Sequence, residues 1–155
     1  MKRIIALLTM ILSLSSFRAF AIKDITYIGI RDMSFKGIGL TETTMELLIE
    51  YNNPNKFGID IRNTVLDVYI NDVFVAKSIQ VDPVRVPSQG HFFFPVTVAF
   101  NPTKALGFTI GNMATAAFLN KPMKIKMTGT ARVGRGFLTV KIPVKIEEEV
   151  NAKFF

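Results

Sequence analysis

Apolar and polar residues alternate with a period of two along most of the chain beyond residue 22. The alternation is clearest in four segments: 43–51, 91–100, 122–133 and 137–149. Successive side chains of a β-strand point to opposite sides of a sheet, so each segment is expected to be a strand with one dry and one wet face. Strands of this kind are typical of antiparallel sheets that bury one face and leave the other in water.

Short turn signals separate these strands. Asn71-Asp72 divides one alternating stretch, and both residue types tolerate the positive φ of a tight hairpin turn. A second hairpin is expected around Gly134 and Gly136, which supply flexible turn positions. Residues 82–90 contain two prolines and a glycine and are expected to form a connector or an irregular edge.

Two features modify the strand pattern. Pro95 and Pro143 fall within predicted strands, and because proline cannot donate a ladder hydrogen bond, an edge or a bulge is expected at each. Residues 101–120 place apolar residues near helical spacing, and Asn101 can cap a helix there. Several short strands with one connecting helix predict an all-β fold, an antiparallel β-sandwich crossed at one end by a short helix.

The first residues have the features of a secretory signal peptide. Two basic residues precede an apolar run over 4–14, and residues 19–21 form an A-x-A cleavage pattern. The run is shorter than the roughly 20 apolar residues that a membrane-spanning helix needs. We therefore expect a signal peptide over 1–21 and one domain over 22–155, located in the periplasm or secreted. An uncleaved N-terminal membrane anchor is the alternative.

Composition narrows the chemistry. The chain contains no cysteine, which excludes disulfides, cysteine-zinc sites, thiol nucleophiles and a lipidated-cysteine anchor. A hydrophobic share of 49% is enough for a packed core. Signal-peptide cleavage would remove three basic residues from the formal net charge of +7. The remaining positive charge is small and unclustered, so nucleic-acid binding is not expected.

Groups for catalysis are sparse. His91 is the only histidine and is expected to be an exposed residue at a strand end. Glu46 and Glu50 should lie on one wet strand face about 13 Å apart at ~3.3 Å per residue, too far for the roughly 5–9.5 Å of a glycosidase pair. Glu147 to Glu149 could hold a cation weakly, but they are expected to begin a solvated tail. We expect no catalytic residue, no metal and no cofactor, and therefore no enzyme.

The last predicted hairpin is rich in basic residues. If its register is simple, six of them share its wet face: Lys124, Lys126, Arg132, Arg135, Lys141 and Lys145. Such a face could attract anionic lipid headgroups or acidic proteins. Ordinary charge that keeps a sheet soluble and blocks edge pairing is the favoured alternative.

The order of these features resembles the type 2 late embryogenesis abundant proteins, also called the LEA14-like or WHy-domain family. A strand reaches "YNNPNKFGIDI", the hairpin "VYINDVFVAKS" follows, and the strand "FFFPVTVAF" comes after a Pro/Gly connector. The shared N-P-N-x-F element consists of Asn53, Pro54, Asn55 and Phe57, and the resemblance covers residues 24–147. It implies a sandwich related to fibronectin type III and immunoglobulin domains. It also implies a non-enzymatic protein that protects client proteins or membranes during desiccation, cold or other stress. We expect the protein to be a monomer.

Two alternatives remain open at this point. Asn53-Pro54-Asn55 is interpreted as a corner between strands, with Asn55 in a left-handed turn, in preference to a ligand-binding loop. The alternative function is an envelope accessory or adhesion-type interaction module. Phe93 lies opposite the Phe92/Phe94 face, and its exposure would indicate a partner surface.

Overall fold

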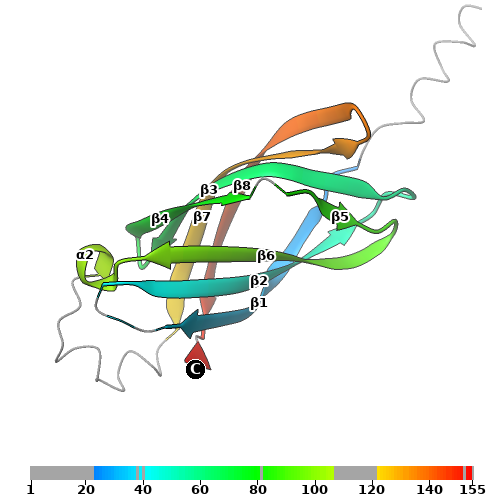
Figure 1. Cartoon of the computed structure of the whole chain (residues 1–155). Coiled ribbons are helices and arrows are strands. Elements are labelled where there is room, and N and C mark those ends of the chain that lie inside the picture. Colours follow the sequence, from blue (N-terminus) through cyan, green and yellow to red (C-terminus); the bar gives the residue numbers. More distant parts are fainter. Residues whose placement is uncertain are drawn as a thin grey trace, which may run out of the picture.

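The computed structural model describes residues 23–37, 39, 41–80, 82–106, 122–151 and 153–154. In these residues two mainly antiparallel sheets pack against each other, with a short helix at one end (Figure 1). Apolar side chains from both sheets fill the space between them, including the fully buried Met33, Ile49, Val68 and Met127. The β-sandwich predicted from the alternation is confirmed.

The first sheet has the strand order β6-β2-β1-β9. Its strands are β1 (Thr26–Lys36), β2 (Thr43–Asn53), β6 (Gly90–Phe100) and β9 (Lys153–Phe154). Two bulges interrupt β1, after Tyr27 and after Ile30. Along β6, buried and exposed residues alternate without a break, and Pro95 lies on this edge strand as predicted.

The second sheet has the order β4-β3-β7-β8, with β5 paired to the start of β3. Its strands are β3 (Ile59–Ile70), β4 (Val73–Gln80), β5 (Val84–Val86), β7 (Met123–Arg135) and β8 (Leu138–Val150). Pro143 lies on the edge strand β8, as predicted. Glu147 to Glu149 belong to this strand and pair with β7, so the prediction of a solvated tail is wrong.

The turns follow the sequence signals with one exception. Asn71 and Asp72 have φ values of 49° and 65°, which confirms the predicted hairpin turn between β3 and β4. Gly136 has a φ of 60° and begins the two-residue turn between β7 and β8. Gly134 lies inside β7 opposite Thr139, so its predicted role in the turn is wrong.

The predicted helix is confirmed only at its start. α2 (Pro102–Leu106) begins after Asn101, whose Oδ1 accepts a hydrogen bond from the Lys104 backbone N–H at 2.8 Å. This is the expected capping bond, three residues into the helix. Residues 107–120 of the prediction lie outside the described part of the chain.

Candidate functional site

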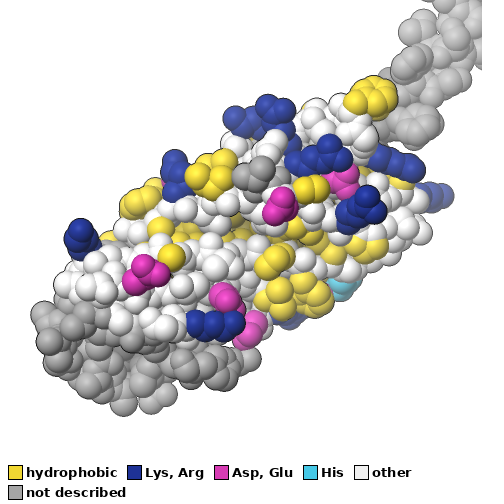
Figure 2. Space-filling view, viewed as in Figure 1, with side chains coloured by type: hydrophobic (Ala, Val, Ile, Leu, Met, Phe, Trp, Pro, Cys, Tyr) yellow, Lys and Arg dark blue, Asp and Glu magenta, His cyan; other side chains and the backbone are white. Residues whose placement is uncertain are grey.

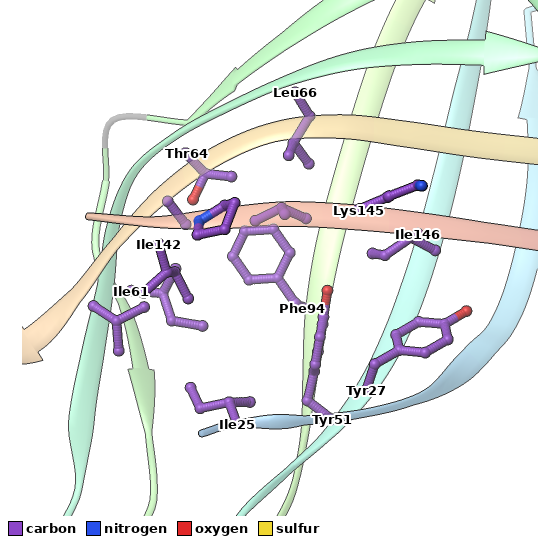
Figure 3. A pocket seen from close by; sticks show the side chains of 14 residues that line it. Ile25, Tyr27, Tyr51, Ile61, Thr64, Leu66, Phe94, Ile142, Lys145 and Ile146 are labelled. Carbon is purple, nitrogen blue, oxygen red and sulfur yellow. The ribbon is translucent and has the colours of Figure 1, made fainter. Parts of the chain in front are cut away.

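A cleft of about 190 Å³ lies between the two sheets, beside the edge strand β8 (Figure 3). Apolar side chains from both sheets form most of its wall: Ile25, Tyr51, Ile61, Leu66, Phe94, Ala131, Val133, Ile142, Val144 and Ile146. Ile142 and Val144 are half-buried and form its rim. The cleft exists because the apolar inner face of β8 extends beyond the cover that the first sheet provides.

Few polar groups reach this cleft. Among the described residues they are the hydroxyls of Thr64, Tyr27 and Tyr51. Lys145 also borders the cleft, but its side chain lies on the outer face of β8 and points away from the cleft (Figure 3). Burial raises the pKa of Tyr51 to about 12. Burial, and then its hydrogen bond to Glu148, also raises the pKa of Tyr27. Both phenols therefore stay neutral at physiological pH, and the polar groups that the described wall offers are neutral hydroxyls.

Glu148 fastens the two sheets together next to the cleft. By its position in β8 its side chain lies on the inner side of the second sheet, toward β1. There it accepts hydrogen bonds from the Tyr27 hydroxyl and, at 3.0 Å, from the Ile30 backbone N–H. The Ile30 donor is available because the bulges of β1 remove regular ladder partners at this point. We call this group the Glu148 clasp.

Asn53 and Asn55 form a buried amide network at the corner between β2 and β3. The Asn53 Oδ1 accepts hydrogen bonds from the backbone N–H and the side-chain amide of Asn55, at 3.0 and 2.9 Å. Its Nδ2 donates to the Pro87 and Phe57 carbonyls at 2.7 and 3.2 Å. The Asn55 amide pairs with both backbone groups of Lys23, at 2.8 and 2.9 Å.

This geometry supports the corner interpretation and corrects one detail of it. The two asparagine side chains are 0% and 3% exposed, so neither faces a ligand from solvent. Asn55 is not among the residues with a positive φ, so the predicted left-handed turn is wrong. Its side chain instead bonds a segment 32 residues earlier in the chain. Pro54 and Phe57 are half-buried in the same corner.

The surroundings of Glu50 also differ from the prediction. It is only 6% exposed and accepts hydrogen bonds from the Arg31 side chain, while its Oε1 lies 2.5 Å from His91 Nδ1. The Arg31 hydrogen bond, followed by the His91 contact, lowers the Glu50 pKa. The prediction of a solvated Glu50 is wrong, whereas His91 is exposed as expected and holds this carboxylate.

Two of the predicted basic residues lie beside acidic or aromatic neighbours, and one of them, Lys124, is paired with carboxylates. Lys124 Nζ lies 3.1 Å from Asp72 and 3.0 Å from Glu147. The Glu147 hydrogen bond, and then the Asp72 bond, raises the Lys124 pKa. Lys126 lies opposite Glu147 and places its ammonium 5.5 Å from the centre of the Tyr69 ring. This end of the hairpin therefore offers little net positive charge.

The other basic residues lie closer to the β7–β8 turn. Arg132 is directly opposite Lys141 on the outer face. Lys145 is on the same face, because it is separated from Lys141 by an even number of positions along β8. No salt bridge to these three is found in the described part of the chain. Arg135 is two positions beyond the inward-facing Val133, so the expectation that it shares the outer face is wrong.

The family model for late embryogenesis abundant protein (LEA_2) matches residues 48–148. The chain belongs to the late embryogenesis abundant (LEA_2) family. No curated protein sequence matches this LEA_2 protein.

Two solved structures are similar to this LEA_2 chain over most of its length. A crystal structure of a protein from Archaeoglobus fulgidus shares 15% identity at a TM-score of 0.48, covering 87% of this chain and 100% of that one. A solution structure of an Arabidopsis thaliana protein shares 12% identity at a TM-score of 0.43, covering 88% of this chain and 90% of that one.

The LEA_2 match includes most of the structural features described above. It begins in β2 and ends in β8, so it contains the Asn53/Asn55 corner and the cleft wall except for Ile25 and for Tyr27 of β1. Among the described residues no group of histidine and acidic side chains is arranged to hold a metal ion. The described helix is too short to cross a membrane.

Sequence reasoning missed the cleft. Its wall comes from six strands that are far apart in sequence, and period-two alternation assigns all of them to one ordinary core. One signal was available: Thr64 places a hydroxyl on an inward-facing, buried position of β3. Alternation alone does not say how far the two sheets lie apart at this position.

Proposed function

We propose that the protein is a non-enzymatic, exported stress-protection protein that binds apolar groups of other molecules in the cleft between its sheets. Membership of the late embryogenesis abundant family supports the stress-related role. The apolar cleft beside β8 is the observation that carries the binding role. The finer LEA14-like or WHy assignment is part of the proposal and is supported by the N-P-N-x-F motif.

The composition of the cleft wall favours binding over catalysis. Catalytic sites bring together titratable groups whose environments push their pKa values apart. Here the titratable side chains are two neutral phenols, and no carboxylate or histidine of the described residues lines the cleft. A wall of this kind can hold an apolar group and hydrogen-bond one polar end of it, but its described residues offer no acid–base pair.

The size of the cleft limits what it can hold. A cavity of about 150 Å³ in another protein accommodates a benzene molecule. The cleft of about 190 Å³ is therefore suited to one apolar chain or ring with a single polar end. We propose that its targets are apolar side chains of unfolding client proteins or acyl chains of perturbed membranes. No cofactor and no nucleic acid take part.

Export and oligomeric state belong to the same proposal. Cleavage before Ile22 would release a monomer into the periplasm or the extracellular medium. The intact mass of protein purified from the secreting host tests this: a mature chain beginning at Ile22 supports cleavage. A mass that retains residues 1–21 would support the N-terminally anchored alternative.

A probe of the cleft tests the binding role. Anilinonaphthalene sulfonate is an apolar dye with one anionic group, and its fluorescence rises when it leaves water. Wild type should bind it, and Ala131→Leu, which fills the cleft from β7, should bind it at least tenfold more weakly. Ala99→Leu on the exposed face of β6 is the matched control and should bind like wild type. Equal dye binding by the wild type and Ala131→Leu, at unchanged Tm, would contradict the proposal.

Protection itself is tested by drying a labile enzyme with each protein. Wild type should preserve more enzyme activity than an equal mass of albumin, and Ala131→Leu should lose most of that advantage. Ile142→Thr at the rim of the cleft provides a second variant in case Ala131→Leu does not fold. Protection no better than that of albumin would reject the stress-protection role.

The interaction-module alternative keeps one supporting observation. Phe93 and Leu48 are 51% and 37% exposed on the outer face of the first sheet, next to Pro95 of β6. Figure 2 shows hydrophobic side chains gathered there, beside the histidine. If this face binds an envelope protein, Phe93→Ser should abolish capture of one stoichiometric partner while dye binding in the cleft stays unchanged.

A further inference from the structure

The β7–β8 hairpin ends in exposed apolar side chains. Phe137, in the turn, is 93% exposed, and Leu138 and Val140 at the start of β8 are 66% and 54% exposed. Leu138 and Val140 alternate along β8 and therefore project from the same side of the hairpin. Large apolar side chains gathered at a turn are unusual on a soluble surface and mark a contact site.

The opposite side of the same hairpin end is basic. Arg132 and Lys141 lie directly across from each other on the outer face. Arg135 is exposed beside the turn but lies opposite Leu138, on the apolar side. No acidic residue occurs in the sequence from residue 128 to residue 146. Figure 2 shows Lys and Arg side chains around this end of the molecule. The hairpin end is therefore amphipathic, with an apolar side and a cationic side.

The β3–β4 hairpin at the other end of the second sheet provides a contrast within the same protein. Its turn also exposes two apolar residues, Val73 at 43% and Phe74 at 50%. Two nearby cations are paired with carboxylates, however: Lys124 with Asp72, and Lys77 with Asp67 at 3.3 Å. A third, Lys126, lies over the Tyr69 ring. At the β7–β8 end, by contrast, Arg132 and Lys141 have neither a salt bridge nor an aromatic ring contact among the described residues.

We propose that the end of the β7–β8 hairpin is a membrane-contacting element that inserts Phe137 and Leu138 into the interface of an anionic bilayer while Arg132 and Lys141 bind lipid headgroups. Apolar groups in the interface and cations at the headgroups are the combination that holds amphipathic segments on membranes. The complementary charge favours an anionic bilayer as the partner. The inference does not depend on ligand binding in the cleft.

The position of the N-terminal segment agrees with this orientation. The described chain starts at Lys23, and Ile25 lines the same cleft as Ile142 of β8. In Figure 1 the start of β1 and the β7–β8 turn lie at the same end of the sandwich. Contact at the hairpin would bring this end, including the rim of the cleft, to the bilayer surface.

A single tryptophan reporter tests insertion, because the chain contains no tryptophan. Phe137→Trp is made in the exported protein, and its fluorescence emission is followed as vesicles containing phosphatidylglycerol are added. The emission should shift to shorter wavelength, and vesicles of phosphatidylcholine alone should cause no shift. Phe74→Trp at the β3–β4 turn is the matched reporter and should not shift with either vesicle. No shift of Phe137→Trp, or an equal shift of Phe74→Trp, would overturn the proposal.

Co-sedimentation with vesicles separates the contribution of the apolar side chains to membrane binding from that of the cations. The double variant Phe137→Ser/Leu138→Ser should partition to anionic vesicles at least tenfold more weakly than wild type, because each buried apolar side chain contributes strongly to partitioning. Arg132→Gln/Lys141→Gln should also weaken binding on the order of tenfold at low salt, with a smaller loss at high salt. Val73→Ser/Phe74→Ser should bind like wild type. Unchanged binding of both β7–β8 variants, measured at unchanged Tm, would reject the membrane contact even if the cleft binds its dye.

Discussion

Two buried asparagines act as structural connectors of this sandwich. Asn53 and Asn55 satisfy backbone groups of Lys23, Phe57 and Pro87, which belong to three separate segments. A buried amide has two donors and two accepting lone pairs, so it can replace backbone ladder bonds where strands end. The N-P-N-x-F pattern is therefore explained by hydrogen bonding inside the corner. Its role in function is to hold Lys23, and with it the start of β1, against the rest of the fold.

Asn55→Ala tests this role. The change removes the partners of both backbone groups of Lys23 and leaves part of the Asn53 amide without a bond. Unsatisfied buried polar groups cost about 1–3 kcal/mol each, so the free energy of unfolding should fall by about 2–3 kcal/mol. Urea denaturation measures this. Lys56→Ala, exposed in the same corner, should change stability by less than about 0.5 kcal/mol. Equal effects of the two variants would contradict the network.

Glu50 makes stability depend on pH in the acidic range. The Arg31 and His91 contacts lower its pKa below the ordinary 4.5, so the native carboxyl binds a proton less readily than the unfolded one. Its stabilisation is complete above about pH 4.5 and is lost as pH falls through the lower native pKa. Between pH 6 and pH 3, Tm should therefore fall more in the wild type than in Glu50→Gln. Glu46→Gln, whose partner Lys36 is exposed, should follow the wild-type curve. A wild-type pH dependence in Glu50→Gln would contradict this assignment.

At the scale of elements, the β7–β8 hairpin depends on close backbone contact at Gly134. A Cβ added there would lie 2.0 Å from the Leu138 carbonyl oxygen and 2.7 Å from the Thr139 Cα. Gly134→Ala should therefore destabilise the protein by about 3 kcal/mol or more, because the strands must separate. Gly136→Asn should cost less than about 1 kcal/mol, because asparagine tolerates the φ of 60° and the site is open. Thermal unfolding compares the two, and a tolerated Gly134→Ala would show that the hairpin is looser than described.

Features of these elements that depend on residues close together in the sequence were predictable, and features that depend on contacts between distant strands were not. Alternation depends on neighbours along one strand, and it located the strands and the edge prolines correctly. The role of Gly134 depends on register with β8, and the burial of Glu50 depends on a bulge in β1 and on His91 of another strand. Register and bulges are set by contacts between strands, and one sequence contains no direct record of them.

At the scale of the whole molecule, one side of the sandwich is closed differently from the other. The edge strands β4 and β6 approach each other, and the Ser78 hydroxyl of β4 lies 3.4 Å from the Thr97 carbonyl of β6. On the opposite side, β8 meets β1 mainly at the Glu148 clasp, and the cleft lies beside it. The clasp therefore determines how far the two sheets can separate where the proposed ligand enters.

Glu148→Ala should loosen this side while leaving the fold intact. The variant removes the acceptor for the Tyr27 hydroxyl and the Ile30 N–H, and hydrogen bonds to a charged group are worth about 1.5–3 kcal/mol, so the free energy of unfolding should fall by about 2–3 kcal/mol. Because the sheets are then less restrained at the cleft, binding of anilinonaphthalene sulfonate should increase. Glu149→Ala, exposed on the outer face of β8, should change neither quantity. A Glu148→Ala protein with wild-type stability and dye binding would show that the sheets are held apart by core packing alone.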